Sequence, residues 1–227
     1  MKPSILSIST LGALLLAAWM PASLAGPTYS ESLKAGDEAM NAGKNEDALK
    51  EFEAAVGQAA SPQEKALAQG KAAYVLAFKL KDYAKARKLA EEAGKTAGLT
   101  PLAEMTVCQV LAECQMRADK NYLGAALNLE KALALPDIDF ARPFLSLGLA
   151  DCYRETKDFH KAIDICKKIL ETPGLAPATL ASAHFNMGLT YQYGLMEPDN
   201  AKAAYAKAVE LNPALKEQAK IHLEKMP

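Results

Sequence analysis

The stretch LAECQ at residues 111–115 returns as LADCY at 149–153 and, more loosely, as MGLTY at 187–191. Both steps are 38 positions, and the same step taken backwards reaches Ala73-Tyr74 and then Ala35-Gly36. A fixed period of this size is the sequence signature of a repeat protein built from stacked supersecondary units. The sequence therefore predicts five units.

A second landmark follows 13 or 14 residues after the first in every unit, and it consists of small and apolar residues spaced by four and then three positions. The three positions of each unit are Ala48, Phe52 and Ala55; Ala86, Ala90 and Ala93; Ala125, Leu129 and Ala132; Ala162, Cys166 and Ile169; Ala201, Tyr205 and Ala208. Such spacings place side chains on one stripe of a helix. We therefore expect each unit to be two amphipathic helices, the first with a small residue where the second crosses it.

Capping signals mark the starts of several of these helices. Thr28 with Glu31, and Ser61 with Glu64, have the spacing of capping boxes. Thr100 precedes a proline, which is favoured in the first helical turn. Because no stretch alternates between apolar and polar residues as a half-buried strand does, the sequence predicts an all-α fold.

The composition is that of an ordinary folded protein. Of the 227 residues, 50% are hydrophobic and 23% are charged, and the formal net charge is -1. Binding to nucleic acid or to an anionic membrane requires clustered surplus base. The charge balance therefore disfavours both kinds of partner.

A secretory signal peptide is predicted at residues 1–25. Lys2 gives a basic start, Ile5 to Met20 is mostly apolar, and small residues at Ser23–Ala25 suit signal peptidase. We expect cleavage before Gly26 and a mature protein in the periplasm or secreted. No later stretch approaches the ~20 apolar residues that a spanning helix needs, so no transmembrane anchor is expected.

The fifth unit carries a family resemblance. The stretch NMGLTY at 186–191 resembles a tetratricopeptide repeat, together with Ala201, Tyr205, Ala208, Leu211 and Pro213. The fourth unit is similar through Leu149, Ala150, Tyr153, Asp158-Phe159, Ala162 and Ile169, and the last unit also resembles the related Sel1-like repeat. The resemblance implies a right-handed solenoid of five helix-turn-helix repeats over residues 28–212, closed by a capping helix at 213–227.

One departure is the length of the repeat, because the family unit has ~34 residues. We expect the excess mainly between the units, in Ala97–Pro101, Leu135–Pro143 and Thr172–Pro177.

The resemblance also implies a binding surface, because in this family the first helices of the units line a concave groove. By register, the groove positions here are Asp37, Met40 and Asn41; Lys71, Val75, Phe78 and Lys79; Gln109, Glu113, Met116 and Arg117; Asp151, Arg154 and Glu155; Phe185, Leu189, Gln192 and Tyr193. Aromatic, Met and charged side chains suit a peptide or helix laid in a groove. Changes at Phe78, Met116, Arg154 or Phe185 are expected to affect a partner rather than folding.

The implied function is an exported scaffold or adaptor that binds a segment of a cell-envelope protein without catalysis. Two alternatives stay open: a structural subunit that self-assembles through outer faces or end caps, and a groove that is merely solvated.

No pattern indicates an enzyme, a cofactor or a metal site. Gly94-Lys95-Thr96 resembles the end of a phosphate-binding loop, but Leu89 stands where that motif needs glycine. His160, His184 and His222 are scattered without ligand spacing.

Four cysteines in an exported protein leave two interpretations. Either all are free thiols packed in the core, or one bridge forms. Cys152 and Cys166, on the two helices of the fourth unit, are the most plausible pair for a bridge.

Overall fold

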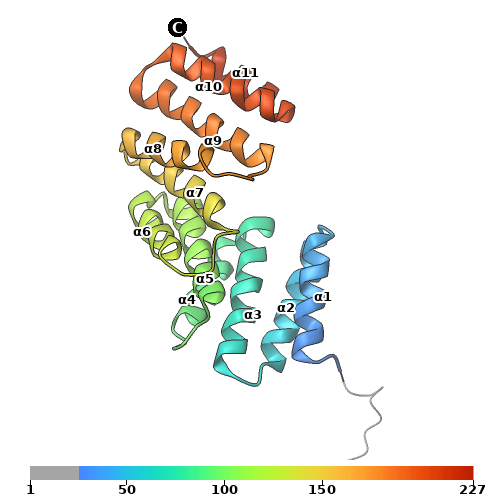
Figure 1. Ribbon diagram of the computed structural model, residues 1–227. Coiled ribbons are helices and arrows are strands. Elements are labelled where there is room, and N and C mark those ends of the chain that lie inside the picture. Colours follow the sequence, from blue (N-terminus) through green and yellow to red (C-terminus); the bar gives the residue numbers. More distant parts are fainter. Residues whose placement is uncertain (1–25, 227) are drawn as a thin grey trace, which may run out of the picture.

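The computed structural model describes residues 26–226, which form a stack of paired helices (Figure 1). The predicted signal peptide, residues 1–25, lies outside the described residues. Each helix from α1 to α10 packs against the next one along the chain, and residues 26–226 contain no strand. The predicted all-α solenoid of helix pairs is therefore confirmed.

Ten helices make up five units. The first unit is α1 (Tyr29–Asn41) and α2 (Asn45–Gln58), the second α3 (Pro62–Tyr74) and α4 (Tyr83–Gly94), the third α5 (Pro101–Cys114) and α6 (Tyr122–Leu133), the fourth α7 (Arg142–Glu155) and α8 (Phe159–Leu170), and the fifth α9 (Pro177–Thr190) and α10 (Pro198–Leu211). A 3₁₀ turn (Pro213–Leu215) and α11 (Lys216–Leu223) follow.

The predicted caps open the first helices of three units. Thr28 and Glu31 form a complete capping box at α1, in which the Thr28 backbone N–H donates to the Glu31 carboxylate at 2.8 Å. At α3 the Glu64 backbone N–H donates to the Ser61 hydroxyl at 3.1 Å, and Thr100 accepts from Ala103 at α5. These bonds satisfy N–H groups that have no partner inside the helix.

Three of the first helices continue in a π-helical turn. These turns are η1 (Val75–Leu80) after α3, η2 (Gln115–Asp119) after α5 and η3 (Tyr191–Leu195) after α9. Each turn stops at a residue with positive φ, namely Lys81, Lys120 or Met196. Part of the excess repeat length therefore lies within the helices, so the prediction that it falls mainly between the units is only partly right.

The small residues of the repeat make room for aromatic rings. A Cβ atom on Gly36 would lie 2.5 Å from the Phe52 ring, and a Cβ atom on Gly188 would lie 2.6 Å from the Tyr205 ring. Both rings are fully buried. The close crossing expected between the two helices of a unit is thus present at both ends of the stack.

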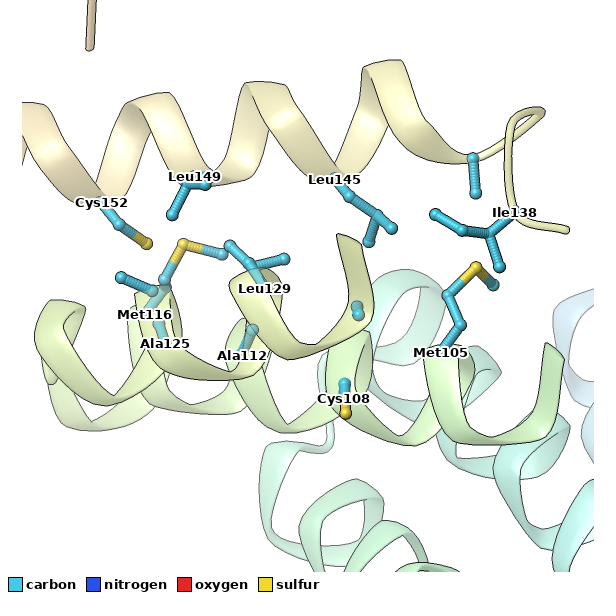
Figure 2. Packing of buried hydrophobic residues seen from close by; sticks show 13 residues of the cluster. Met105, Cys108, Ala112, Met116, Ala125, Leu129, Ile138, Leu145, Leu149 and Cys152 are labelled. Atoms are coloured by element: carbon cyan, nitrogen blue, oxygen red, sulfur yellow. The ribbon is translucent and has the colours of Figure 1, made fainter. Parts of the chain in front are cut away.

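The core of the third and fourth units joins α5, α6 and α7. Figure 2 shows Leu145, Leu149 and Cys152 pointing from α7 towards Met116 and Leu129. All five side chains are buried. This shared core packs α7 against α6.

The C-terminal helix α11 covers the apolar end of the fifth unit. The His222 ring stacks on Tyr205 at 5.8 Å between centroids, and the His222 carbonyl accepts a hydrogen bond from Gln192 at 2.7 Å. The Tyr193 hydroxyl lies 2.9 Å from His222 Nδ1. Ala219 of α11 is buried against the same cluster. The Phe185 and Tyr205 rings are therefore shielded from solvent, and the cap covers this end as a solenoid requires.

His222 in this cap leads us to predict that the folded protein is less stable in mild acid. Burial, with Lys225 and Arg154 nearby, lowers the pKa of His222, and burial with Lys207 lowers the pKa of His184. Because its pKa is lowered, each histidine stays neutral in the folded protein at a pH where it is already protonated in the unfolded chain. The unfolded chain takes up these protons as the pH falls through about 6.5. Stability contributed by the neutral rings is thus present above that pH and lost below it.

We expect the melting temperature to fall between pH 7 and pH 5.5, a window that leaves most carboxylates ionised. His222→Phe, which keeps a ring against Tyr205 but cannot titrate, should show a smaller fall. An equal fall in the parent and in the variant would show that His222 does not contribute.

Candidate functional site: a groove along the first helices

A cavity of about 570 Å³ lies along the first helices of units one to four. It is lined by one residue of α1, Met40; by Leu67, Lys71, Tyr74 and Phe78 of the α3–η1 helix; by Leu102, Met105, Thr106, Gln109, Glu113, Met116 and Arg117 of the α5–η2 helix; by Leu129 of α6; by Phe140 and Ala141 before α7; and by Phe144, Leu145, Gly148 and Asp151 of α7. We call this cavity the groove. A volume of this size is in the range of ligand sites in proteins.

The floor of the groove is the core of the third and fourth units. Met105, Met116, Leu129 and Leu145 belong to that core and also line the groove (Figure 2). Because these side chains are held in the packed core, the floor is preformed.

Three large apolar side chains stand at the mouth of the groove. Phe140 is 65% exposed, Phe144 is 60% exposed and Leu102 is 44% exposed. Single exposed apolar residues are normal on protein surfaces, but a cluster that lines one cavity marks an interaction site.

The connection between α6 and α7 holds Phe140 in place. Ile138 in this connection is fully buried against the core. The Arg142 guanidinium donates to the Leu133 carbonyl at 2.8 Å and lies 3.2 Å from the Asp139 carboxylate. One apolar anchor and two polar contacts therefore fix the segment that carries the phenylalanine.

Aromatic side chains form the wall on the α3 side. The Tyr74 and Phe78 rings are stacked with their centroids 4.6 Å apart. Such pairs add to the stabilisation that comes from burial alone. Both rings keep part of their surface available to the groove, because both are only half-buried.

Charged side chains in and beside the groove form polar contacts within and between the first helices. Lys71 Nζ on α3 lies 2.6 Å from Asp37 Oδ1 on α1. Arg154 on α7 donates to Asp151 at 2.8 Å and to Asn186 on α9 at 2.9 Å. These contacts link successive first helices and fix their spacing.

Two further groups occupy the polar end of the groove. Glu113 is buried and accepts from Arg117 Nε at 3.2 Å. Burial raises the pKa of Asp151, while Arg154 opposes the rise. This end therefore combines a buried carboxylate, Glu113, and a half-buried one, Asp151, with a more exposed guanidinium.

The structure brings some of the predicted groove residues together and separates others. Lining the groove are Met40, Lys71, Phe78, Gln109, Glu113, Met116, Arg117 and Asp151. The remaining predicted positions do not line it: Asp37, Asn41, Val75, Lys79, Arg154, Glu155, Phe185, Leu189, Gln192 and Tyr193. The groove is thus a feature of units one to four, and the first helix of the fifth unit does not take part.

Three of these residues correct the expectation that groove side chains point away from the core. Val75 is fully buried in a core cluster with Phe52. Phe185 is buried with its ring 5.2 Å from that of Tyr205. Gln192 is buried and accepts from the Tyr205 hydroxyl at 2.8 Å. Changes at these positions are therefore changes in the core.

The prediction from the helical register did not include the residues that make the groove most apolar. Leu67 and Met105 lie one helical turn before the predicted Lys71 and Gln109, so a longer stripe would have included them. Phe140 lies in a connection that follows no helical period, and no signal in the sequence pointed to it. Phe144 lies in the first turn of a helix whose start this connection shifts.

All four cysteines are free and buried. Burial raises the pKa of Cys114 to about 11, and that of Cys152 and of Cys166 to about 12. Because the thiolate is the reactive form, these thiols should be inert in the folded protein. The structure contains no bridge between Cys152 and Cys166.

We expect Ellman titration of denatured, unreduced protein to find four thiols, and native protein at pH 8 to react far more slowly. Two thiols in the denatured sample would instead indicate one bridge, and peptide mapping would then test the pair Cys152 and Cys166.

Residues 26–226 contain no group of three or more His, Cys, Asp or Glu side chains placed to hold a metal ion. Within the same range, every helix is too short or too polar to cross a membrane.

Comparison with known proteins places the fold. No family model and no curated protein matches the sequence. Among solved structures, YrrB, described as a TPR protein with an unusual peptide-binding site, is similar at 19% identity with a TM-score of 0.59, over 86% of this chain and 91% of that chain. MamA is similar at 17% identity with a TM-score of 0.57, over 83% of this chain and 94% of that chain. A putative kinesin light chain of Podosopora anserina with TPR-like repeats is similar at 14% identity with a TM-score of 0.61, over 83% of this chain and 96% of that chain. The chain therefore has the tetratricopeptide-repeat fold.

Proposed function

We propose that this protein is a scaffold that binds an apolar segment of a partner protein in the groove. The observation that carries the proposal is the cluster of Phe140, Phe144 and Leu102, three exposed apolar side chains at the mouth of one preformed cavity. Interfaces are anchored by aromatic and large apolar side chains that a partner can fully cover.

The fold supports the same interpretation. Stacked helix pairs present an extended surface on which a peptide can lie. YrrB, which shares the fold, is described as having a peptide-binding site. A peptide occupant also fits the groove lining, because a mainly apolar floor is combined with a few charged groups at one end.

Affinity capture tests the proposal. The mature chain from Gly26 onward is immobilised and exposed to an envelope extract of the source organism. The groove variant carries Leu102→Ala, Phe140→Ala and Phe144→Ala. The matched control carries Leu123→Ala and Leu127→Ala, which remove two exposed leucines of α6 outside the groove.

We expect the parent and the control to capture the same proteins and the groove variant to lose them, with all three showing similar melting temperatures. Losing one anchor of an interface typically costs about 2 kcal/mol or more of binding, so three losses should abolish capture. Capture that survives in the groove variant but disappears in the control would place the binding surface on α6.

The proposal includes export, for which residues 1–25 are the basis. Protein isolated from its native host should then begin at or within a residue or two of Gly26. N-terminal sequencing that finds Met1 on the mature protein would remove this part of the proposal.

A second candidate function is self-assembly, and one observation favours it. Leu123 and Leu127 lie one helical turn apart on α6 and are both strongly exposed. Light scattering after size-exclusion chromatography tests it. This candidate is supported if the parent is a dimer or larger species and the double variant Leu123→Lys with Leu127→Lys is a monomer. A monomeric parent would exclude it.

A further inference from the structure

The groove has two chemically different ends, and they lie along the same helix. Leu102 and Met105 are in the first turns of α5, next to the exposed phenylalanines. Glu113 and Arg117 are towards the other end, in the last turn of α5 and in η2. At 1.5 Å per residue, the ends are separated by roughly 20 Å. An occupant that fills the groove must therefore satisfy both an apolar and a polar environment.

The carboxylates at the polar end are already satisfied. The Glu113 side chain is only 7% exposed and accepts from Arg117. Asp151 accepts from Arg154 at 2.8 Å. Lys71 is bound to Asp37 at 2.6 Å, so its charge is compensated as well. A ligand that enters the groove therefore meets little uncompensated charge from Glu113, Asp151 or Lys71.

Arg117 is different, because most of its hydrogen-bonding capacity is unused. Its side chain is 56% exposed. A guanidinium has five N–H donors, and within residues 26–226 only Nε of Arg117 is hydrogen-bonded, to Glu113. Both terminal nitrogens are therefore available at the groove. They form the planar fork that binds a carboxylate with two parallel hydrogen bonds.

The bond to Glu113 also orients this fork. With Nε held by a buried carboxylate, the guanidinium has lost part of the freedom of a surface arginine. A ligand that binds to it gives up less conformational entropy than it would at a mobile side chain.

Resting on the proposed function, we propose that the bound segment is acidic at one end: it places large apolar side chains between Leu102, Phe140 and Phe144, and an Asp or Glu carboxylate on the terminal nitrogens of Arg117. The partner is thus a protein segment with an apolar part and a carboxylate up to roughly 20 Å away. That distance corresponds to about 14 residues of helix or about six residues of extended chain.

Selection from a displayed library of random 16-residue peptides tests this inference without knowledge of the natural partner. The parent should enrich peptides with apolar clusters and with Asp or Glu. Arg117→Glu should enrich the same apolar clusters with Lys or Arg. Lys88→Glu, a charge reversal on an exposed side chain of α4 outside the groove, should select as the parent does.

The strength of the contact is then measured with one selected peptide and its Glu→Gln twin. The parent should bind the acidic peptide about tenfold more tightly than the twin, because hydrogen bonds to charged groups are the stronger ones. Arg117→Gln should bind both equally. Because this change leaves Glu113 unpaired, the double variant Glu113→Gln with Arg117→Gln is included, and it should also bind both equally.

The outcomes separate this inference from the function on which it rests. In one outcome, the selected peptides bind the parent, lose binding to the triple-alanine variant of Leu102, Phe140 and Phe144, and show no preference for Asp or Glu. This result would overturn the role of Arg117 but would leave the groove assignment standing. If no selected peptide depends on the groove residues, both the groove assignment and the acidic partner are wrong.

Discussion

Tyr205→Ala should lower the free energy of unfolding by about 3–5 kcal/mol, the usual cost of removing a large buried aromatic side chain. The Tyr205 ring is fully buried, packs 5.2 Å from the Phe185 ring and fills the space that Gly188 leaves open. Its hydroxyl donates to the Gln192 side chain at 2.8 Å. The variant therefore creates a cavity and also leaves a buried amide oxygen without its donor.

Urea unfolding followed by circular dichroism measures this loss. Tyr205→Phe keeps the ring and should cost only about 1 kcal/mol, the value of one hydrogen bond. Leu127→Ala, at an exposed site, should change stability by less than about 0.5 kcal/mol. A loss below about 1 kcal/mol for Tyr205→Ala would mean that the fifth unit is not packed as described.

Truncation after Leu211 should have an effect of similar size, because it removes α11. Without α11, the Tyr205 ring loses the stacked His222 ring and Phe185 loses its edge contact with it. Exposing a large apolar side chain costs about 1.5–3 kcal/mol, so uncovering two should cost about 3 kcal/mol or more.

The matched control is Ile221→Ala, which changes an exposed residue of α11 and should leave stability almost unchanged. Both proteins are unfolded in urea and compared with the parent. A truncated protein as stable as the parent would show that α11 does not cap the solenoid.

Repetition explains why the fold could be predicted from the sequence. Gly188 and Tyr205 belong to a pattern that recurs about every 38 residues, so each unit supports the assignment of the others. The capping boxes at Thr28 and Ser61 are equally local, because a cap involves only four consecutive residues. The repeat and the Thr28 capping box are present in the structure as predicted. At Ser61 only half of the predicted box forms, because the Glu64 carboxylate accepts from the Ala60 N–H instead of the Ser61 N–H.

The groove could be predicted only in part, because it depends on how units stack and where the repeat is interrupted. Lys71, Glu113 and Arg117 follow the helical register and line the groove. Phe140 lies in an irregular connection, whose path is set by the burial of Ile138. No period in the sequence encodes such a path.

The errors at Val75, Gln192 and Phe185 have physical causes as well. The first two lie in π-helical turns, where the hydrogen bond spans five residues and the phase of the helix changes. Phe185 follows the register, but α11 brings His222 onto its ring. The exposed face expected from the repeat is therefore covered by an element outside the repeat.

Site-specific photo-crosslinking tests the central claim, that the partner binds in the groove, most directly. A benzophenone amino acid replaces Phe144 at the mouth of the groove in one protein and Leu127 on the exposed side of α6 in another. Both are irradiated in an envelope extract, and the products are identified by mass spectrometry. We predict that the protein labelled at 144 crosslinks to a specific partner and the protein labelled at 127 does not. A specific crosslink from 127 with none from 144 would contradict the claim.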